Sequence, residues 1–187
     1  MAGHPHRQPP GADPLAGVDP ATWWDDSGYA LREYVSPAAD DAMTELVQAE
    51  LGYRLPQSYI AMMRRHNGGI PRMTCCPAAG PTTLAQDHVA VHGIFGIGSK
   101  LSNSLCGQAG SRFWISEWQY PPLGVYFADC PSAGHDMIAL DYRDCGPEGE
   151  PRVVHVDQER DYAVTFLAED YTRFVCGLRS ARASDST

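Results

Sequence analysis

The chain has 187 residues, of which 43% are hydrophobic and 20% are charged, so it has the size and composition of one globular domain and not of a disordered chain. Its 14 basic and 23 acidic residues give a formal net charge of -9, and Lys100 is its one lysine, which argues against a protein that grips a nucleic-acid backbone with clustered cations. An acidic protein of this kind is suited to a basic partner.

The N-terminal segment is rich in proline, glycine and alanine and has no apolar core of a signal peptide. We therefore expect a disordered tail over residues 1–20, a single domain over 21–179 and a frayed, polar tail over 180–187. No run of apolar residues is long enough to span a membrane, and we expect a cytoplasmic location.

Two helices are predicted in the first third of the chain. Ser36 and Pro37 are favourable at a helix start, an apolar stripe follows, and Gly52 is favourable at its end. Pro56 begins a second helix that runs to about His66, where an N-G-G tripeptide supplies residues that tolerate the left-handed conformation.

The middle of the chain predicts an antiparallel sheet. Short β-rich runs are separated by turn clusters that are too short for crossover helices. A last helix is predicted over 168–178. Helices, a run of strands and a final helix predict an α+β fold, in which N-terminal helices and a C-terminal helix pack on the sheet. The predicted strands lie near residues 89–95, 125–129, 136–142 and 152–157.

The segment 50–69 reads E-L-G-Y-R-L-P-Q-S-Y-I-A-M-M-R-R-H-N-G-G and resembles the signature of the SUKH superfamily, the Smi/Knr-like proteins. That signature has an acidic residue and L-G, then L-P, an aromatic residue, an apolar helix and N-G-G. Similar strand and helix segments follow, so that the likeness spans about residues 40–178. The matching positions, which we interpret as structural, are Glu50, Leu55, Pro56, Tyr59, Asn67, Gly68 and Gly69.

The resemblance implies the SUKH fold and a role in protein binding without shared catalytic residues. Bacterial members are commonly inferred to be immunity proteins that neutralise polymorphic toxins, often nucleases or deaminases. Fungal members look like regulators of cell-wall assembly that act through protein contacts. We therefore expect a bacterial, non-catalytic immunity protein that binds a basic toxin domain, with a Smi/Knr-like regulatory scaffold as the alternative.

Two segments outside the family motif are candidates for the partner-binding surface. One is aromatic and lies beside two prolines, and the other is the loop that follows the second helix. Exposed tryptophan and tyrosine dominate interface hot spots, but a long loop can equally pack its own aromatic rings on the body of the protein. The candidate partner-binding residues are Met73, Thr74, Phe113, Trp114, Trp118 and Tyr120.

Metal and catalytic chemistry have weaker signals. The six cysteines are scattered without a C-x-x-C pair, and His88 and His92 share a predicted strand face without an identifiable third ligand, so we expect no metal and no cofactor. Cys130, His135 and Asp136 could supply a thiol nucleophile and a base, although a hairpin turn explains the same residues. A small cysteine-dependent hydrolase is the remaining alternative.

Overall fold

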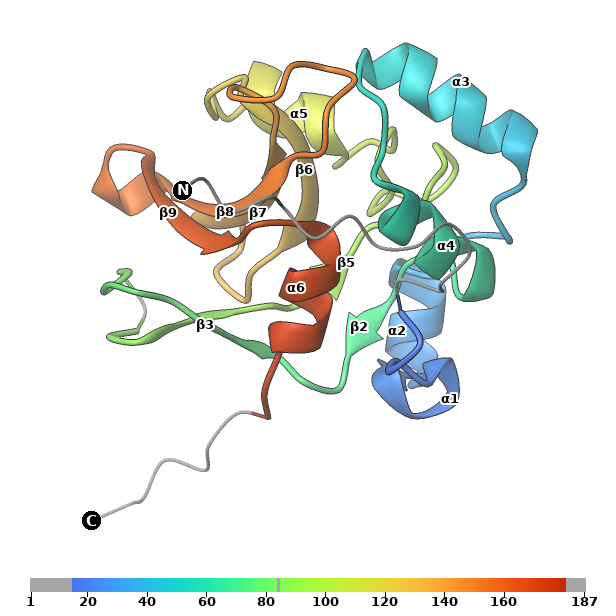
Figure 1. Ribbon diagram of the computed structural model, residues 1–187, viewed down its shortest axis with the longest axis horizontal. Coiled ribbons are helices and arrows are strands. Elements are labelled where there is room, and N and C mark those ends of the chain that lie inside the picture. Colours follow the sequence, from blue (N-terminus) through green and yellow to red (C-terminus); the bar gives the residue numbers. More distant parts are fainter. Residues whose placement is uncertain (1–14, 84, 181–187) are drawn as a thin grey trace, which may run out of the picture.

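The computed structural model describes residues 15–83 and 85–180, and within them helices pack against a five-stranded antiparallel sheet (Figure 1). No helix among these residues has the length and apolar character needed to cross a membrane. The packed chain begins before residue 21, because Leu15 is already buried in the core. The tails expected over 1–14 and 181–187 lie outside the described residues.

The N-terminal part of the chain is mainly helical. The second predicted helix is confirmed as α4, which follows Pro56. Two short strands, β1 before α2 and β2 after α4, pair antiparallel. The elements in order are α1 (Pro20–Trp23), β1 (Trp24–Asp25), α2 (Gly28–Glu33), α3 (Asp41–Leu51), α4 (Gln57–Arg65) and β2 (Ile70–Pro71).

The start of α3 corrects the sequence prediction. The helix begins at Asp41, not near Ser36, and the carboxylate of Asp40 caps it by accepting a 2.7 Å hydrogen bond from the backbone N–H of Met43. The Ser36 N–H instead donates to the carbonyl of Asn67 at 2.9 Å. This segment is therefore tied to the chain that leaves α4 and cannot join the helix.

The predicted antiparallel sheet is confirmed, with the order β5-β6-β7-β8-β9. Each strand pairs antiparallel with its neighbour in the chain. A separate hairpin of β3 (Cys75–Pro77) and β4 (His88–Ala90) extends beyond the sheet (Figure 1). The strands of the sheet are β5 (Gly93–Ile94), β6 (Gly124–Asp129), β7 (Asp136–Asp141), β8 (Arg152–Asp157) and β9 (Ala163–Ala168).

The single strand predicted over 89–95 is wrong, because β4 and β5 belong to different sheets. The Val91 N–H donates to the carbonyl of Thr74 in the hairpin at 2.7 Å, whereas the His92 N–H donates to the carbonyl of Asp129 in the main sheet at 2.9 Å. The chain therefore passes from one sheet to the other between these two residues.

Four elements in the C-terminal half were missed or misplaced by the sequence prediction. The edge strand β9 was not predicted, and neither were α5 (Ser111–Ser116) and the 3₁₀ turn η1 (Gln158–Arg160). The last helix, α6 (Tyr171–Gly177), begins later than expected because Asp170 caps it through a 2.8 Å hydrogen bond from the Arg173 N–H.

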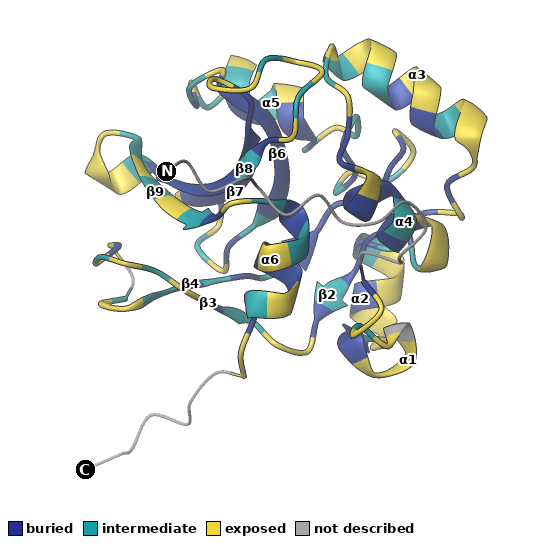
Figure 2. Cartoon of the chain, viewed as in Figure 1, coloured by how far each residue is buried: buried dark blue, intermediate teal, exposed yellow. Residues whose placement is uncertain are grey.

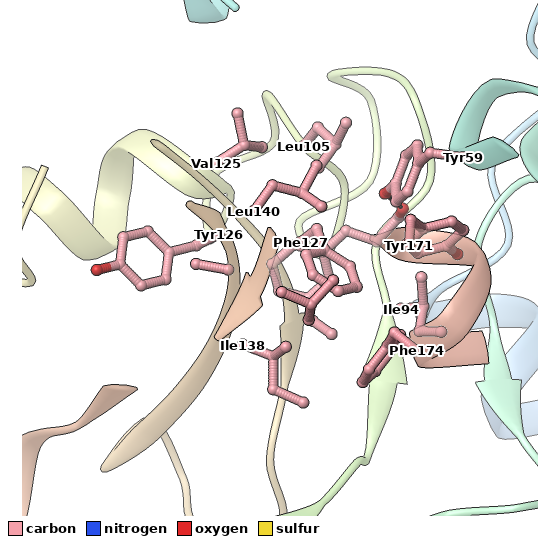
Figure 3. Close-up of a cluster of buried hydrophobic side chains, with 14 of the residues drawn as sticks. Tyr59, Ile94, Leu105, Val125, Tyr126, Phe127, Ile138, Leu140, Tyr171 and Phe174 are labelled. Atoms are coloured by element: carbon pink, nitrogen blue, oxygen red, sulfur yellow. Dashed lines mark hydrogen bonds between the residues drawn. The ribbon is translucent and has the colours of Figure 1, made fainter. Parts of the chain in front are cut away.

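The main core lies between the sheet and helices α4 and α6 (Figures 2 and 3). The Tyr59 ring is 4.8 Å from that of Tyr171, and Phe127 is 5.5 Å from Phe174, both edge-on. In Figure 3, Tyr126 and Phe127 point away from each other, because β6 sends successive side chains to opposite faces. This packing holds β6 in place, and the candidate site lies at the C-terminal end of that strand, at Asp129.

Candidate functional site

A pocket of about 360 Å³ lies where the end of β6 meets α2, α5 and the chain before β5. A hollow of about 420 Å³ near α3 is larger, but its charged groups, Arg54 and Glu148, have exposed side chains. We select the smaller pocket because perturbed ionisable groups line it, as they do at functional sites. Its main lining residues are Tyr29, Tyr34, His92, Trp114, Asp129 and Cys130.

The carboxylate of Asp129 is held in a fixed position in this pocket. Its Oδ2 accepts a 2.8 Å hydrogen bond from the Tyr34 hydroxyl, and its Oδ1 accepts one of 2.9 Å from the Gly93 N–H. Burial raises the pKa of Asp129, and the Tyr34 hydrogen bond and the nearby His92 ring only partly oppose this shift. The pocket therefore contains a carboxylate that a cation would stabilise in its charged form.

Aromatic rings surround this carboxylate. Tyr29 on α2 is 49% exposed, and its ring centre lies 6.3 Å from that of His92. The Trp114 ring on α5 also lines the pocket and packs 5.3 Å from Trp118. Such rings offer apolar contact area and can stack on a cationic group.

The turn between β6 and β7 is shaped by a glycine. Gly134 has φ +94°, and a Cβ atom there would lie 2.7 Å from the Trp114 ring. The carbonyl of Gly134 accepts a 2.7 Å hydrogen bond from the Tyr120 hydroxyl. The turn can lie against the aromatic rings only because this residue has no side chain.

A second group of reactive side chains lies next to the pocket, and we call it the Cys130–Asp136–His155 cluster. Cys130 follows β6, Asp136 begins β7 and His155 lies in β8, so three neighbouring strands supply them. All three are buried, and their potential ligand atoms lie within 4.8 Å of one another. The Nε2 atom of His155 is 2.8 Å from Oδ2 of Asp136.

The cluster contains an ionised carboxylate and a protonated thiol. Burial raises the pKa of Asp136, but hydrogen bonds from His155 and Ser132 outweigh it and the net shift is downward. Burial and then the charge of Asp136 raise the pKa of Cys130 well above that of a free thiol. This environment disfavours the thiolate that a cysteine nucleophile needs.

Two of the predicted binding residues are buried. Trp114 and Tyr120 are only 8% and 1% exposed, so neither is an exposed anchor. The Tyr120 ring packs 5.2 Å from those of Tyr126 and Tyr162. The segment thus packs its own aromatic rings on the sheet, which is the alternative that the sequence left open, and Phe113 and Trp118 are partly buried at its surface.

The second predicted binding segment lies elsewhere. Met73 is 43% exposed, and Thr74 is half-buried. The carbonyl of Thr74 accepts a hydrogen bond from the Val91 N–H. In Figure 1 this segment, between β2 and β3, lies at the bottom of the molecule and α5 at the top. The two predicted segments are therefore separate surfaces.

The family-motif residues make contacts within the fold. The Asn67 side chain donates to the carbonyls of Pro37 and Ile97, at 2.6 and 2.9 Å, and accepts from the Ile97 N–H at 2.7 Å. Gly68 has φ +88°, and a Cβ there would lie 2.4 Å from the Tyr34 carbonyl oxygen. Leu55 and Tyr59 are buried, Pro56 precedes α4, and Glu50 in α3 accepts a hydrogen bond from Arg112 through its carbonyl.

The histidines proposed from the sequence lie apart from the cluster. His88 is in β4 and pairs with Asp87, whereas His92 lies beyond that strand against Tyr34. The predicted shared strand face is therefore wrong. His135 pairs with Glu159 in a half-exposed position, and the histidine beside Asp136 is His155, which sequence reasoning missed.

Helices packed on an antiparallel sheet, among the described residues, make this an α+β domain. A family model described as the SMI1 / KNR4 family (SUKH-1) matches residues 38–177. The match covers more than half of the chain, and the chain belongs to this family, as its sequence motif indicates. Comparisons with curated proteins and with solved structures found no match.

Proposed function

We propose that the protein is a non-catalytic, immunity-type binding module that neutralises a basic toxin domain by docking onto it. The observation that carries this proposal is the Asp129 carboxylate in its aromatic-walled pocket. Among the described residues, no arginine or lysine forms an ion pair with Asp129. A basic side chain from a partner would supply the missing counter-charge.

The chemistry of the pocket favours a guanidinium or ammonium group. Such a group can pair with the carboxylate of Asp129 and stack on the ring of Tyr29. Domains that hold nucleic-acid phosphates tend to be cationic, and the net charge of -9 would speed their encounter with this protein. Inhibition then requires only that the toxin surface is blocked.

A cysteine-dependent hydrolase is less well supported. Cys130 is buried, its thiol has a raised pKa, and its acidic neighbour Asp136 is ionised. A nucleophilic cysteine needs a base in contact with an accessible, readily ionised thiol. These features favour binding over thiol chemistry.

The experiment is a binding measurement with toxin domains encoded beside this gene. The association and dissociation rates of wild type, Tyr29→Ala and Asp129→Asn are compared by surface plasmon resonance at low and moderate salt. We expect each substitution to weaken binding about tenfold or more, because anchors in a desolvated pocket typically contribute at least about 1.4 kcal/mol. The weakening should lie mainly in the dissociation rate.

Leu46→Ala on α3 is the matched control, since Leu46 is 67% exposed and does not line the pocket. It should bind as wild type does. Tight toxin binding that neither pocket substitution weakens would exclude this pocket as the docking site. Turnover of a substrate that depends on Cys130 would exclude the non-catalytic role itself.

A further inference from the structure

We propose that the Cys130–Asp136–His155 cluster is a binding site for one zinc ion, held by the Cys130 thiolate, a carboxylate oxygen of Asp136 and a ring nitrogen of His155. The inference does not depend on the proposed function. It adds a metal site to a chain whose sequence lacks the short paired spacings of zinc motifs.

The geometry of the cluster is close to that of a metal site. The three residues bring one sulfur, one oxygen and one nitrogen donor within 4.8 Å of one another. In a tetrahedral zinc site with bonds of about 2.0–2.3 Å, ligand atoms lie roughly 3.3–3.8 Å apart. The His155–Asp136 contact of 2.8 Å would therefore need to widen by less than about 1 Å, with water as a fourth ligand.

Unpartnered polar atoms point to a missing ligand. Asp136 Oδ1, His155 Nδ1 and Asp157 Oδ1 are buried and have no hydrogen-bond partner among the described residues. The backbones of Asp136 and Asp157 pair directly across β7 and β8, which puts both side chains on one face of the sheet. Buried polar atoms without partners cost free energy, and a cation held by the Asp136 carboxylate would use the free capacity of its Oδ1 atom.

The buried charge also calls for a cation. Asp136 and Asp157 are both buried, and within the described residues neither forms an ion pair with arginine or lysine. Zn²⁺ would displace the Cys130 thiol proton to solvent, and the ion would then balance one thiolate and the Asp136 carboxylate. The donor set of sulfur, nitrogen and oxygen suits zinc rather than calcium or magnesium.

The cluster adjoins the pocket that contains Asp129. Cys130 lines that pocket, and the potential ligand atoms of Asp136 and His155 lie within 4.8 Å of the Cys130 sulfur. The site could not be recognised from the sequence, because its ligands come from the end of β6, from β7 and from β8. Cys130 and Asp136 are 6 residues apart, and Asp136 and His155 are 19 apart.

The test is a metal titration of full-length protein that has been stripped with a chelator and kept reduced. Addition of Co²⁺ should give one equivalent of binding with a thiolate-to-cobalt charge-transfer absorption in the near ultraviolet. Zn²⁺ should abolish that absorption by displacement and raise the thermal midpoint. X-ray absorption of the zinc form should give one sulfur ligand and the remaining ligands as nitrogen or oxygen.

Two variants make the assignment specific. Cys130→Ser should lose the charge-transfer band. Cys76→Ser should keep it, because Cys76, the other buried cysteine, lies in β3 and not in the cluster. The proposal is overturned if wild type shows no such band, or if the band survives Cys130→Ser or is lost in Cys76→Ser. If Cys130→Ser fails to fold, the X-ray absorption of wild-type protein decides, because a zinc shell without sulfur or with several sulfurs overturns the site.

Discussion

His155 and Asp136 form a buried pair, with Nε2 of the histidine 2.8 Å from Oδ2 of the carboxylate. Because the pKa of Asp136 is lowered, the carboxylate is ionised and accepts a hydrogen bond from the Nε2–H group of His155. Two strands that are adjacent in the sheet are therefore joined by a charge-assisted hydrogen bond as well as by their backbones.

The first prediction concerns this pair. In the presence of chelator, Asp136→Asn should lower the free energy of unfolding by about 1.5–3 kcal/mol, because it weakens a buried hydrogen bond to a charged group. Urea unfolding measures the change. Asp144→Asn is the control, since that carboxylate is 73% exposed and its ion pair with Arg152 should contribute no more than about 1 kcal/mol. Equal losses in the two variants would contradict the prediction.

The second prediction concerns the pH dependence of two carboxylates whose pKa shifts have opposite signs. The lowered pKa of Asp136 gives stability that is present above the unfolded pKa and is lost as pH falls through the folded pKa. The raised pKa of Asp129 gives stability that is fully present below the unfolded pKa and is lost as pH rises through the folded pKa.

Wild type should therefore lose stability relative to Asp136→Asn as the solution is acidified below the ordinary range of a carboxyl group. Relative to Asp129→Asn it should gain stability on acidification from neutral pH. Urea midpoints of the three proteins across this pH series measure both differences. If acidification changes the stability of wild type in the same direction relative to both variants, the pKa shift of Asp136 or of Asp129 has been assigned the wrong sign.

The third prediction concerns the main core. Met63 and Phe174 are 0% and 1% exposed, so Met63→Ala and Phe174→Ala should each lower the free energy of unfolding by about 2–5 kcal/mol. Leu46→Ala removes a comparable side chain from an exposed position and should change it by less than about 0.5 kcal/mol. Thermal and urea unfolding provide the comparison, and a core variant as stable as Leu46→Ala would refute the assignment.

Local signals in the sequence predicted much of this fold. The N-G-G tripeptide does follow α4, but the helix ends with His66 in an extended conformation, and the left-handed residue is Gly68, with φ +88°. The Asn67 side chain is used for bonds to Pro37 and Ile97. The strands β6, β7 and β8 were found because apolar runs and turn clusters alternate there. The start of α3 was misplaced because a tertiary contact, the bond from Ser36 to Asn67, outweighs a local capping preference.

The candidate site was harder to predict because its residues meet only in three dimensions. The sequence singled out Cys130 and Asp136, but it paired them with His135, which is their neighbour in the chain and not in space. One usable signal was overlooked. His155 interrupts the apolar run of β8, and a polar residue within a buried strand needs a partner.

The last prediction concerns the turn that closes the pocket. Gly134 and Gly146 have similar backbone angles, φ +94° and +74°, but only at Gly134 would an added Cβ atom meet a neighbour, the Trp114 ring at 2.7 Å. Gly146→Ala should cost about 1–2 kcal/mol, which is the strain of a left-handed alanine. Gly134→Ala should cost about 1–3 kcal/mol more, because the ring must also move. Only Gly134→Ala should alter tryptophan fluorescence and near-ultraviolet circular dichroism. Indistinguishable unfolding energies for the two variants, with unchanged tryptophan signals, would mean that the turn does not rest on Trp114.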